Sequence, residues 1–374
     1  MLYKDLCNEK VSALSFGTMR LPTNDGNDSD IDVTATASMV EYAIKNGVNY
    51  FDTAWGYHHG NSERVMGEIL SKYSRDSFYI ASKFPGYDLS NFEKIEEIFN
   101  KQLEKCKVEY FDFYLFHNLC EMNADRYIGN YNGVVDFLVE QKKNGKIKHL
   151  GLSVHADTDV LESFLGLYGQ HIEFCQIQLN YLDWDFQDAK SKVELLNRLG
   201  IPIIVMEPLR GGKLANLSAE NLKMLNELRP DETSVSWAFR YLQSVDGVAT
   251  VLSGMSNMQQ LCQNIEIFSD YKPLNEQETK VIYLIASNLL QNTTPCTECR
   301  YCVEYCPKGL DIPMLIGLSN EHTFTQGGFL APMRINSLEE DKRPSACIGC
   351  RSCETVCPQN IKISEVLSDF NQKL

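Results

Sequence analysis

Eight of the 13 cysteines lie in two short runs near the C-terminal end of the sequence. Residues 296–307 read CTECRYCVEYCP and residues 347–358 read CIGCRSCETVCP, so both follow the pattern C-x2-C-x2-C-x3-C-P. Thiolates at this spacing can wrap a four-iron, four-sulfur cube. Structural zinc is the alternative for CxxC pairs. However, zinc sites rarely use four cysteines in this dense order before a proline, and this sequence contains the pattern twice. The runs therefore predict two [4Fe–4S] clusters, with the ligands Cys296, Cys299, Cys302, Cys306, Cys347, Cys350, Cys353 and Cys357.

A second set of reactive side chains lies far from these cysteines. Asp52, Tyr57, Lys83 and His117 each stand at, or just beyond, the end of a short apolar run. A phenol has an ordinary pKa of about 10, and a nearby ammonium stabilises the phenolate and lowers that pKa. A carboxylate can hold the ammonium charged, and an imidazole can position an oxygen atom. Together these types can deliver a proton to an oxygen on which negative charge develops.

The elements that position these residues alternate between strands and helices. Helix candidates include Thr34–Asn46, Asn91–Lys105 and Ala189–Leu199, and Gly47 and Gly200 follow two of them, where a helix end needs positive φ. The predicted strands are Ala13–Gly17, Tyr50–Thr53, Phe78–Lys83, Asp112–His117, Lys148–Val154, Phe174–Asn180, Pro202–Glu207 and Val248–Ser253.

Strand–helix units repeated in this way favour an α/β fold, a (β/α)8 TIM barrel, whose chemistry lies at the carboxyl ends of the strands. An open, doubly wound sheet is the alternative. It needs a G-x-G-x-x-G fingerprint after its first strand, where this sequence reads TMRLPTNDGN.

The four polar residues, in this order, resemble the catalytic tetrad of the aldo/keto reductases, and the resemblance covers about residues 10–270. It implies that Tyr57 is the general acid of carbonyl reduction and the base of alcohol oxidation. It further implies that Lys83 lowers the pKa of Tyr57, that Asp52 orients Lys83, and that His117 positions the substrate oxygen. The neighbouring His58 and His59 either shape the substrate pocket or lie at the surface.

The same resemblance implies a nicotinamide cofactor, NADPH or NADH. Ser153 in GLSVH and Gln176 in CQIQLN would hold its carboxamide, the stretch MEPLRGGKL its pyrophosphate, and the stretch from Gly254 its adenosine end. The implied contacts are Gly17, Thr18, Met19, Asp52, Ser153, Gln176, Pro208, Leu209, Gly211, Gly212, Gly254, Ser256, Gln260 and Asn264.

Two departures leave the choice between NAD and NADP open. The sequence is more similar to the potassium-channel β subunits and their bacterial relatives than to the aldose-reductase branch. That branch has a tyrosine that stacks on the nicotinamide, where this chain has Met206. It also has two cations for the 2′-phosphate, where this chain has Gly254 and Gln260, so Arg210 or Lys213 would have to compensate.

The cysteine runs resemble those of two-cluster ferredoxins, in which the fourth cysteine of each run binds the other cluster. One cluster would then take Cys296, Cys299, Cys302 and Cys357, and the second would take Cys347, Cys350, Cys353 and Cys306. Between the runs, DIPMLIGLSNEHTF predicts a helix and Gln326–Gly328 a turn, and ISEVLSDFNQ predicts a closing helix. This resembles the small, mainly α-helical ferredoxin-like domains of larger redox enzymes. The other cysteines are expected to be buried small hydrophobes: Cys7, Cys106, Cys120, Cys175 and Cys262.

Composition limits the remaining possibilities. The 374 residues are 44% hydrophobic and carry a net charge of −15, which disfavours nucleic acid and anionic membranes as partners. No long apolar run predicts a membrane span, and Met1–Lys10 lacks the apolar core of a signal peptide, so we expect a cytoplasmic protein. The step in cysteine content predicts a barrel domain over 1–290, ending in an apolar helix at Lys280–Leu290, and an iron–sulfur domain over 291–374.

We therefore expect an oxidoreductase that transfers a hydride between a nicotinamide cofactor and a small carbonyl or alcohol substrate. The clusters would pass single electrons to or from a ferredoxin or flavoprotein partner. A hydride cannot pass through a cluster, and no sequence feature indicates a flavin that would convert two electrons to one. One alternative is a redox-sensing or docking barrel with little turnover, against which the intact tetrad argues. Another is clusters with a purely structural role.

Overall fold

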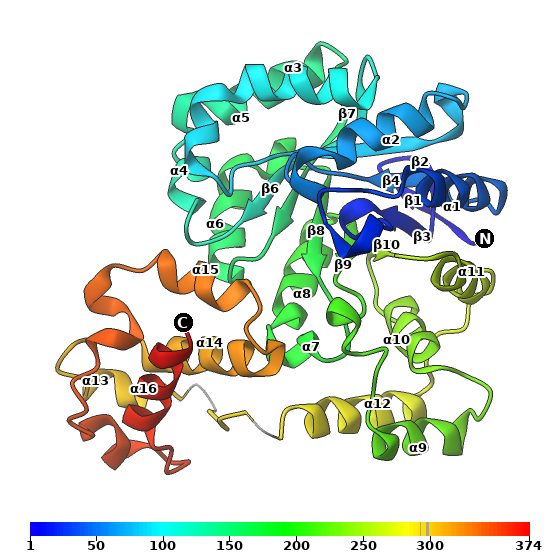
Figure 1. The fold of residues 1–374 in the computed structure, drawn as a ribbon. Coiled ribbons are helices and arrows are strands. Elements are labelled where there is room, and N and C mark those ends of the chain that lie inside the picture. The colour runs from blue at the N-terminus through cyan, green and yellow to red at the C-terminus, as the bar shows by residue number, and fades with distance from the viewer. Residues whose placement is uncertain (292, 297–298) are drawn as a thin grey trace. The chain divides into compact units, whose positions relative to one another are not determined.

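Eight parallel strands close into a barrel in the first of two structural units (Figure 1). The computed structural model describes residues 1–291, 293–296 and 299–374, and its contacts divide the chain into Met1–Ile285 and Ala286–Leu374. The strands pair in the order β10-β3-β4-β5-β6-β7-β8-β9 and confirm the predicted barrel. They are β3 Leu14–Gly17, β4 Tyr50–Asp52, β5 Tyr79–Phe84, β6 Phe111–Leu119, β7 Ile147–Val154, β8 Phe174–Gln178, β9 Ile203–Met206 and β10 Val248–Gly254.

Helices surround the barrel and connect its strands (Figure 1). The helices with predicted counterparts agree with the expected ranges, with two exceptions. Helix α3 begins at Ile95, because Leu89–Lys94 form a 3-10 turn, and α12 begins at Glu276, four residues before the predicted Lys280. Gly47 and Gly200 follow α1 and α8 with φ of 88° and 69°, which confirms the expected helix ends. The helices are α1 Val33–Lys45, α2 Ser62–Leu70, α3 Ile95–Cys106, α4 Ala124–Ile128, α5 Val134–Lys143, α6 Thr158–Tyr168, α7 Asp183–Phe186, α8 Ala189–Leu199, α9 Ala219–Leu228, α10 Ser234–Gln243, α11 Met258–Ile267 and α12 Glu276–Leu289.

An antiparallel hairpin that the sequence analysis missed closes the amino-terminal end of the barrel. It comprises β1 (Tyr3–Leu6) and β2 (Glu9–Ser12), joined by a turn in which Cys7 and Asn8 have φ of 56° and 68°. Two apolar side chains of the hairpin, Leu6 and Val11, are fully buried in the core that fills the barrel. The barrel interior is therefore packed at this end, and the carboxyl ends of the strands are left for chemistry.

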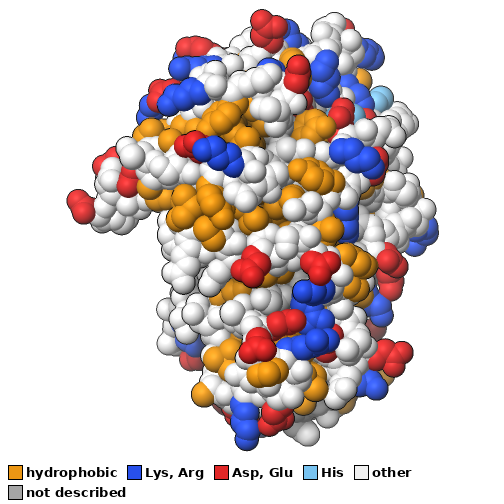
Figure 2. All heavy atoms as spheres, turned by 90° about the vertical axis from the view of Figure 1, so that its right-hand side faces the viewer, with side chains coloured by type: hydrophobic (Ala, Val, Ile, Leu, Met, Phe, Trp, Pro, Cys, Tyr) orange, Lys and Arg blue, Asp and Glu red, His pale blue; other side chains and the backbone are white. Residues whose placement is uncertain are grey.

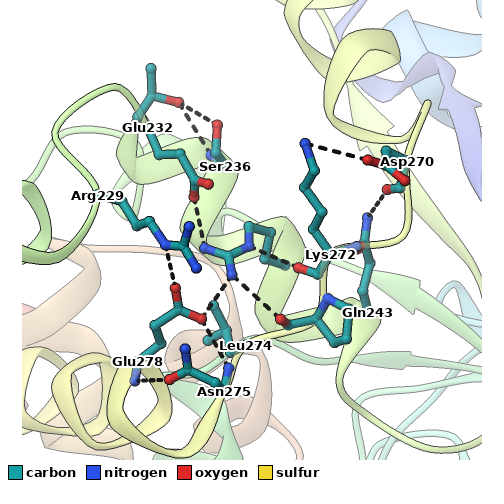
Figure 3. A network of polar contacts seen from close by, with 12 residues as sticks. Arg229, Glu232, Ser236, Gln243, Asp270, Lys272, Leu274, Asn275 and Glu278 are labelled. Carbon is teal, nitrogen blue, oxygen red and sulfur yellow. Dashed lines mark hydrogen bonds and ion pairs between the residues drawn. The ribbon is translucent and has the colours of Figure 1, made fainter.

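A buried polar network fixes the start of α12 to α10 (Figure 3). Arg240 on α10 donates to Glu278 on α12 at 2.8 Å and to Glu232 at 2.7 Å, and Arg229 donates to Glu278 at 2.7 Å. Arg240 and Glu278 are 5% and 2% exposed. Because α12 runs across the division between the two units, we keep the domain ranges 1–290 and 291–374 as a proposal.

The second unit is mainly helical, as predicted. Asp311 accepts a hydrogen bond from the backbone N–H of Met314 and starts α14, and Gln326, with φ of 55°, ends it. An apolar core that includes Leu315, Leu367 and Phe370 joins α14 to α16. The helices are α13 Tyr301–Glu304, α14 Ile312–Thr325, α15 Leu330–Asn336 and α16 Ile363–Lys373.

The surface mixes charges of both signs. On the face drawn in Figure 2, acidic and basic side chains lie among exposed apolar ones, and neither sign covers the face. Within the described part of the chain, no helix combines the length and the apolar character that a membrane crossing requires.

Candidate active site and cluster sites

Three of the four tetrad residues meet around one buried ammonium group. Lys83 Nζ, on β5, lies 2.5 Å from Asp52 Oδ1 at the end of β4, and it donates to the Thr53 carbonyl at 2.8 Å. It also lies 3.4 Å from the hydroxyl of Tyr57, which begins the 3-10 turn Tyr57–Gly60. Lys83 and Asp52 are 0% and 2% exposed. The adjacent parallel strands β4 and β5, with the turn that follows β4, thus place a carboxylate, an ammonium and a phenol at one point of the rim.

The electrostatics of this group keep the lysine charged. Burial alone would lower the pKa of Lys83, but Asp52 and Tyr57 raise it more, so that its pKa lies above the ordinary value. Burial raises the pKa of Asp52, and the ammonium opposes that shift. The expectation that Asp52 holds Lys83 as a cation fits this arrangement.

The expected effect of Lys83 on Tyr57 is present, but it is outweighed. Lys83 does lower the pKa of Tyr57, but burial of the phenol raises that pKa by more, and Asp52 adds to the rise. The net pKa therefore lies above its ordinary value. Tyr57 therefore keeps its proton at neutral pH, as its expected role as a general acid requires.

His117, on β6, faces the phenol as a neutral ring. Its centroid lies 6.1 Å from that of Tyr57 and 5.2 Å from that of Tyr87. Burial, with contributions from Lys83 and His155, lowers the pKa of His117 well below its ordinary range. Among the described residues nothing hydrogen-bonds its buried Nδ1. A neutral imidazole with an unused nitrogen can bind an incoming oxygen.

Tyr87 was missed by the sequence analysis, which followed only strand ends and the positions of the tetrad. It lies in the loop after β5, and a Cβ built on Gly56 would come 2.4 Å from its hydroxyl oxygen. The hydroxyl therefore rests against the residue that precedes Tyr57. Burial, with a contribution from Tyr57, raises the pKa of Tyr87 to about 12.

The two histidines after Tyr57 have different environments. His58 is 3% exposed, and its Nε2 accepts a hydrogen bond from the backbone N–H of Leu21 at 3.1 Å. Its Nδ1 must then carry the proton, which it donates to the Asp28 carbonyl at 2.9 Å. His58 thus ties the loop after β3 to the turn that carries Tyr57. His59 is exposed, in agreement with a surface position.

The residues expected to bind the cofactor all lie at the carboxyl ends of the strands or in the following segments. Gly17 and Gly254 end the neighbouring strands β3 and β10 and pair with each other. Pro208 and Leu209 follow β9, and the other residues fall in the turns and helices beyond: Thr18 and Met19 in a 3-10 turn, Gly211 and Gly212 in another, and Ser256, Gln260 and Asn264 in or before α11.

Several of these side chains are held by the protein itself. The Thr18 hydroxyl donates to the Asp52 carbonyl at 2.9 Å, and Asn264 Nδ2 donates to Ser253 at 3.1 Å. The Ser256 hydroxyl donates to the Arg20 carbonyl at 3.0 Å, and its N–H donates to Gln260 at 2.8 Å. These contacts shape the loops, so ligand contacts by Thr18 and Asn264 would depend on their remaining hydrogen-bonding capacity.

Ser153 and Gln176 are register partners on β7 and β8. Ser153 accepts the backbone N–H of Asn118 at 2.8 Å, and Gln176 Nε2 lies 3.5 Å from the Met206 sulfur. In the described structure the buried Gln176 Oε1 has no partner. An acceptor left open at the rim fits the amide of a nicotinamide.

Of the two cations that the sequence analysis considered for the phosphate, Arg210 is engaged by another side chain, and a third cation, Arg20, lies beside two of the expected contacts. Arg210 is buried and its guanidinium pairs with Asp183 at 3.0 Å, so it braces the loop after β9. Arg20 is exposed, and its side chain lies beside both Gly254 and Gly211: a Cβ built on either glycine would come 3.2 or 3.5 Å from it. Arg20 directly follows GTM in the sequence, but no charge pattern marked it.

The eight cysteines of the two runs surround two hollows in the second unit. One hollow is lined by Cys296, Cys299, Cys302 and Cys357, and the other by Cys306, Cys347, Cys350 and Cys353. This grouping is the one that the exchange of the fourth cysteine implies. The runs themselves pack together through α13 and the 3-10 turn Ser352–Val356.

The donor chemistry of the hollows fits a cluster better than a single ion. No three His, Cys, Asp or Glu side chains of the described residues converge on one metal-ion position, and none of the cysteines forms a disulfide. The thiols instead stand around a volume, as a cube with four corner irons requires. Outside the runs, Cys106, Cys120 and Cys175 are buried as expected, whereas Cys7 and Cys262 are only partly buried.

Comparison with known proteins agrees with both units. Residues 13–285 match the aldo/keto reductase family, and residues 295–361 match a 4Fe–4S dicluster domain. An uncharacterised oxidoreductase of Bacillus subtilis, YqkF, is 24% identical over 304 residues, which cover 73% of this chain and 92% of that protein.

Solved structures show the same barrel. The holo form of an aldo-keto reductase from Bacillus halodurans matches with a TM-score of 0.62 and 24% identity, over 76% of this chain and 96% of that one. An aldo-keto reductase from Klebsiella pneumoniae in complex with NADPH matches with a TM-score of 0.59 and 17% identity, over the same shares. The chain therefore belongs to the aldo/keto reductase family of NAD(P)-dependent oxidoreductases and carries a 4Fe–4S dicluster domain after its barrel.

Proposed function

We propose that the barrel transfers a hydride between NADPH or NADH and a small carbonyl or alcohol substrate, with Tyr57, Lys83, Asp52 and His117 as its catalytic group. The observation that carries the proposal is the buried ammonium of Lys83, which contacts both the Asp52 carboxylate and the Tyr57 hydroxyl. Nucleic acid and membranes play no part in it.

In carbonyl reduction, a nicotinamide held at the rim would supply the hydride for the carbonyl carbon. Tyr57 gives its hydroxyl proton to the oxygen, and it regains a proton from solvent. Lys83 stabilises the phenolate left behind, because its charge lies 3.4 Å from that oxygen and is held by Asp52. His117, being neutral, donates or accepts a hydrogen bond at the substrate oxygen and orients it.

The cofactor would lie along the rim of the barrel. Gln176 Oε1 accepts from an amide there, beside Ser153, and Gly211 and Gly212, with φ of 64° and 94°, let backbone N–H groups approach a phosphate. Arg20, between Gly211 and Gly254, supplies the cation that neither Gly254 nor Gln260 provides. The remaining contacts expected from the sequence belong to the same proposal.

The second unit would hold two [4Fe–4S] clusters, each bound by three cysteines of one run and the fourth of the other. Clusters of this kind pass one electron at a time. We propose that they exchange electrons with a ferredoxin or flavoprotein partner, and that carbonyl reduction in the barrel proceeds without them.

Tyr57→Phe tests the catalytic group, with Tyr87→Phe as its matched control. Both remove one hydroxyl near His117. We expect Tyr57→Phe to abolish carbonyl reduction and to leave NADPH binding intact, and Tyr87→Phe to retain turnover. Turnover of an aldehyde by Tyr57→Phe at the wild-type rate would refute the proton donor. If neither the wild-type protein nor the variants turn over aldehyde although all of them bind NADPH, a sensing or docking barrel would be favoured.

Anaerobic mixing with NADPH or NADH tests the separation of the two chemistries. We expect the visible absorbance of the clusters to persist while aldehyde is reduced. Bleaching by the nicotinamide alone would contradict this separation and would require a two-to-one electron converter between the sites.

A further inference from the structure

Each cysteine run places an arginine in the same unusual backbone conformation. Arg300 and Arg351 directly follow the second cysteine of their runs, and both are left-handed, with φ of 63° and 60°. This conformation is costly for a side chain with a Cβ and is the usual place for glycine. Since the two runs are separate stretches of sequence, the repeat is not the result of one local loop.

Both arginines lie at the rims of the hollows. Arg300 lines the hollow of Cys296, Cys299, Cys302 and Cys357, and Arg351 lines the other one. Arg300 pairs with Asp311 at the start of α14 at 2.8 Å, and Arg351 pairs with Glu365 in the first turn of α16 at 3.3 Å. Each guanidinium is thus paired with an acid at the start of a later helix of the same unit.

Stability alone does not account for this repeat. The arginine side chains are 58% and 63% exposed, so packing does not require them. An exposed ion pair adds little to the free energy of folding because solvent screens it. The left-handed backbone of a residue with a Cβ destabilises the fold by a similar amount, so the two effects offset each other. The property that glycine would lack at these positions is the positive charge.

A charge at these rims acts on the cluster that the hollow would hold. A [4Fe–4S] cluster with four thiolate ligands is an anion, and its reduction adds one further negative charge. A fixed cation beside it stabilises the reduced form more than the oxidised form. We propose that Arg300 and Arg351 are tuning residues that raise the reduction potentials of the two clusters. The inference rests on the cluster assignment of the proposed function.

The test is an anaerobic redox titration of the full-length protein, followed by electron paramagnetic resonance. We expect Arg351→Gln and Arg351→Gly to lower the midpoint potential of one cluster equally, and Arg351→Lys to leave it unchanged. The expected change in the one-electron reduction equilibrium is up to about tenfold, which corresponds to 59 mV. The matching variants of Arg300 should act on the other cluster.

Substitution of the acidic partners gives a second test that keeps both arginines in place. Glu365→Gln and Asp311→Asn remove a nearby negative charge and should raise the potentials. Unchanged midpoint potentials in Arg300→Gln and Arg351→Gln would overturn the tuning role. So would a lysine variant whose midpoint potential falls as far as that of the matching glutamine variant. Absence of cluster iron from the wild-type protein would instead refute the cluster assignment, so the two failures are distinct.

Discussion

Removing the carboxylate of Asp52 should destabilise the barrel strongly, because it strands a buried charge. Lys83 is 0% exposed, and in Asp52→Asn its ammonium keeps only neutral partners, the Thr53 carbonyl at 2.8 Å and the Tyr57 hydroxyl at 3.4 Å. Breaking one side of a buried ion pair costs about 3–5 kcal/mol. Asn has the shape of Asp, so no cavity adds to this loss.

The double variant Asp52→Asn/Lys83→Met separates the stranded charge from other effects. With both charges gone, we expect it to be at least about 2 kcal/mol more stable than Asp52→Asn. Glu68→Ala, which breaks an exposed pair with Arg64, is the control and should cost less than about 1 kcal/mol.

Urea unfolding followed by tryptophan fluorescence measures these differences in the barrel alone. The three tryptophans, Trp55, Trp184 and Trp237, all belong to the first unit. The deficit of Asp52→Asn should be larger at pH 6 than at pH 9. Without Asp52, burial lowers the pKa of Lys83, so the unfolded chain binds more protons and the folded state loses stability as pH falls. A deficit below about 1 kcal/mol, or no recovery in the double variant, would refute this reasoning.

Three further predictions concern single residues. Because the net pKa of Tyr57 is raised, the rate of carbonyl reduction should stay level from pH 6 to pH 9 and fall only above about pH 10. The rate of alcohol oxidation should rise with pH. A reduction rate that already falls between pH 7 and 8 in a pH–rate profile would contradict this prediction. Arg20→Ala should weaken NADPH binding about tenfold in calorimetry, and Arg20→Lys should restore most of it; equal affinity of wild type and Arg20→Ala would exclude a phosphate contact. Glu278→Ala should cost about 2–3 kcal/mol in urea unfolding, because it removes one of the two acidic partners of the buried Arg240 and leaves only Glu232. Glu276→Ala, exposed on the same helix, should cost less than about 1 kcal/mol, and equal costs would refute the role of the network.

The barrel could be predicted because its strands carry their signal locally. Parallel strands buried on both faces appear as continuous apolar runs, and Gly47 and Gly200 mark helix ends that need positive φ. The amino-terminal hairpin was missed because its local signal is weak. Its turn, Cys7–Asn8, has positive φ at both residues, but it lacks the glycine that usually marks such a turn.

The site was predictable where residue type and position suffice, and not where the environment decides. Strand ends located Asp52 and Lys83, because parallel neighbours end at one rim. Arg210 could not be assigned in this way, since its partner Asp183 lies 27 residues away in the sequence and engages its guanidinium. Arg20 carries no motif and gains its place only from the pairing of β3 with β10, which brings Gly17 beside Gly254.

The pKa of Tyr57 shows why the chemistry of such a site cannot be predicted from sequence, because it depends on several opposing contributions. Its neighbours in the motif predict a lowered pKa, because Lys83 contributes in that direction. Burial of the same hydroxyl acts the other way and is larger, and Asp52, which holds the lysine, adds a charge that also opposes the phenolate. The ion pair that fixes Lys83 therefore limits how far Lys83 can acidify the phenol. A site built in this way keeps Tyr57 protonated at neutral pH, which is the state that a proton donor to a substrate oxygen requires.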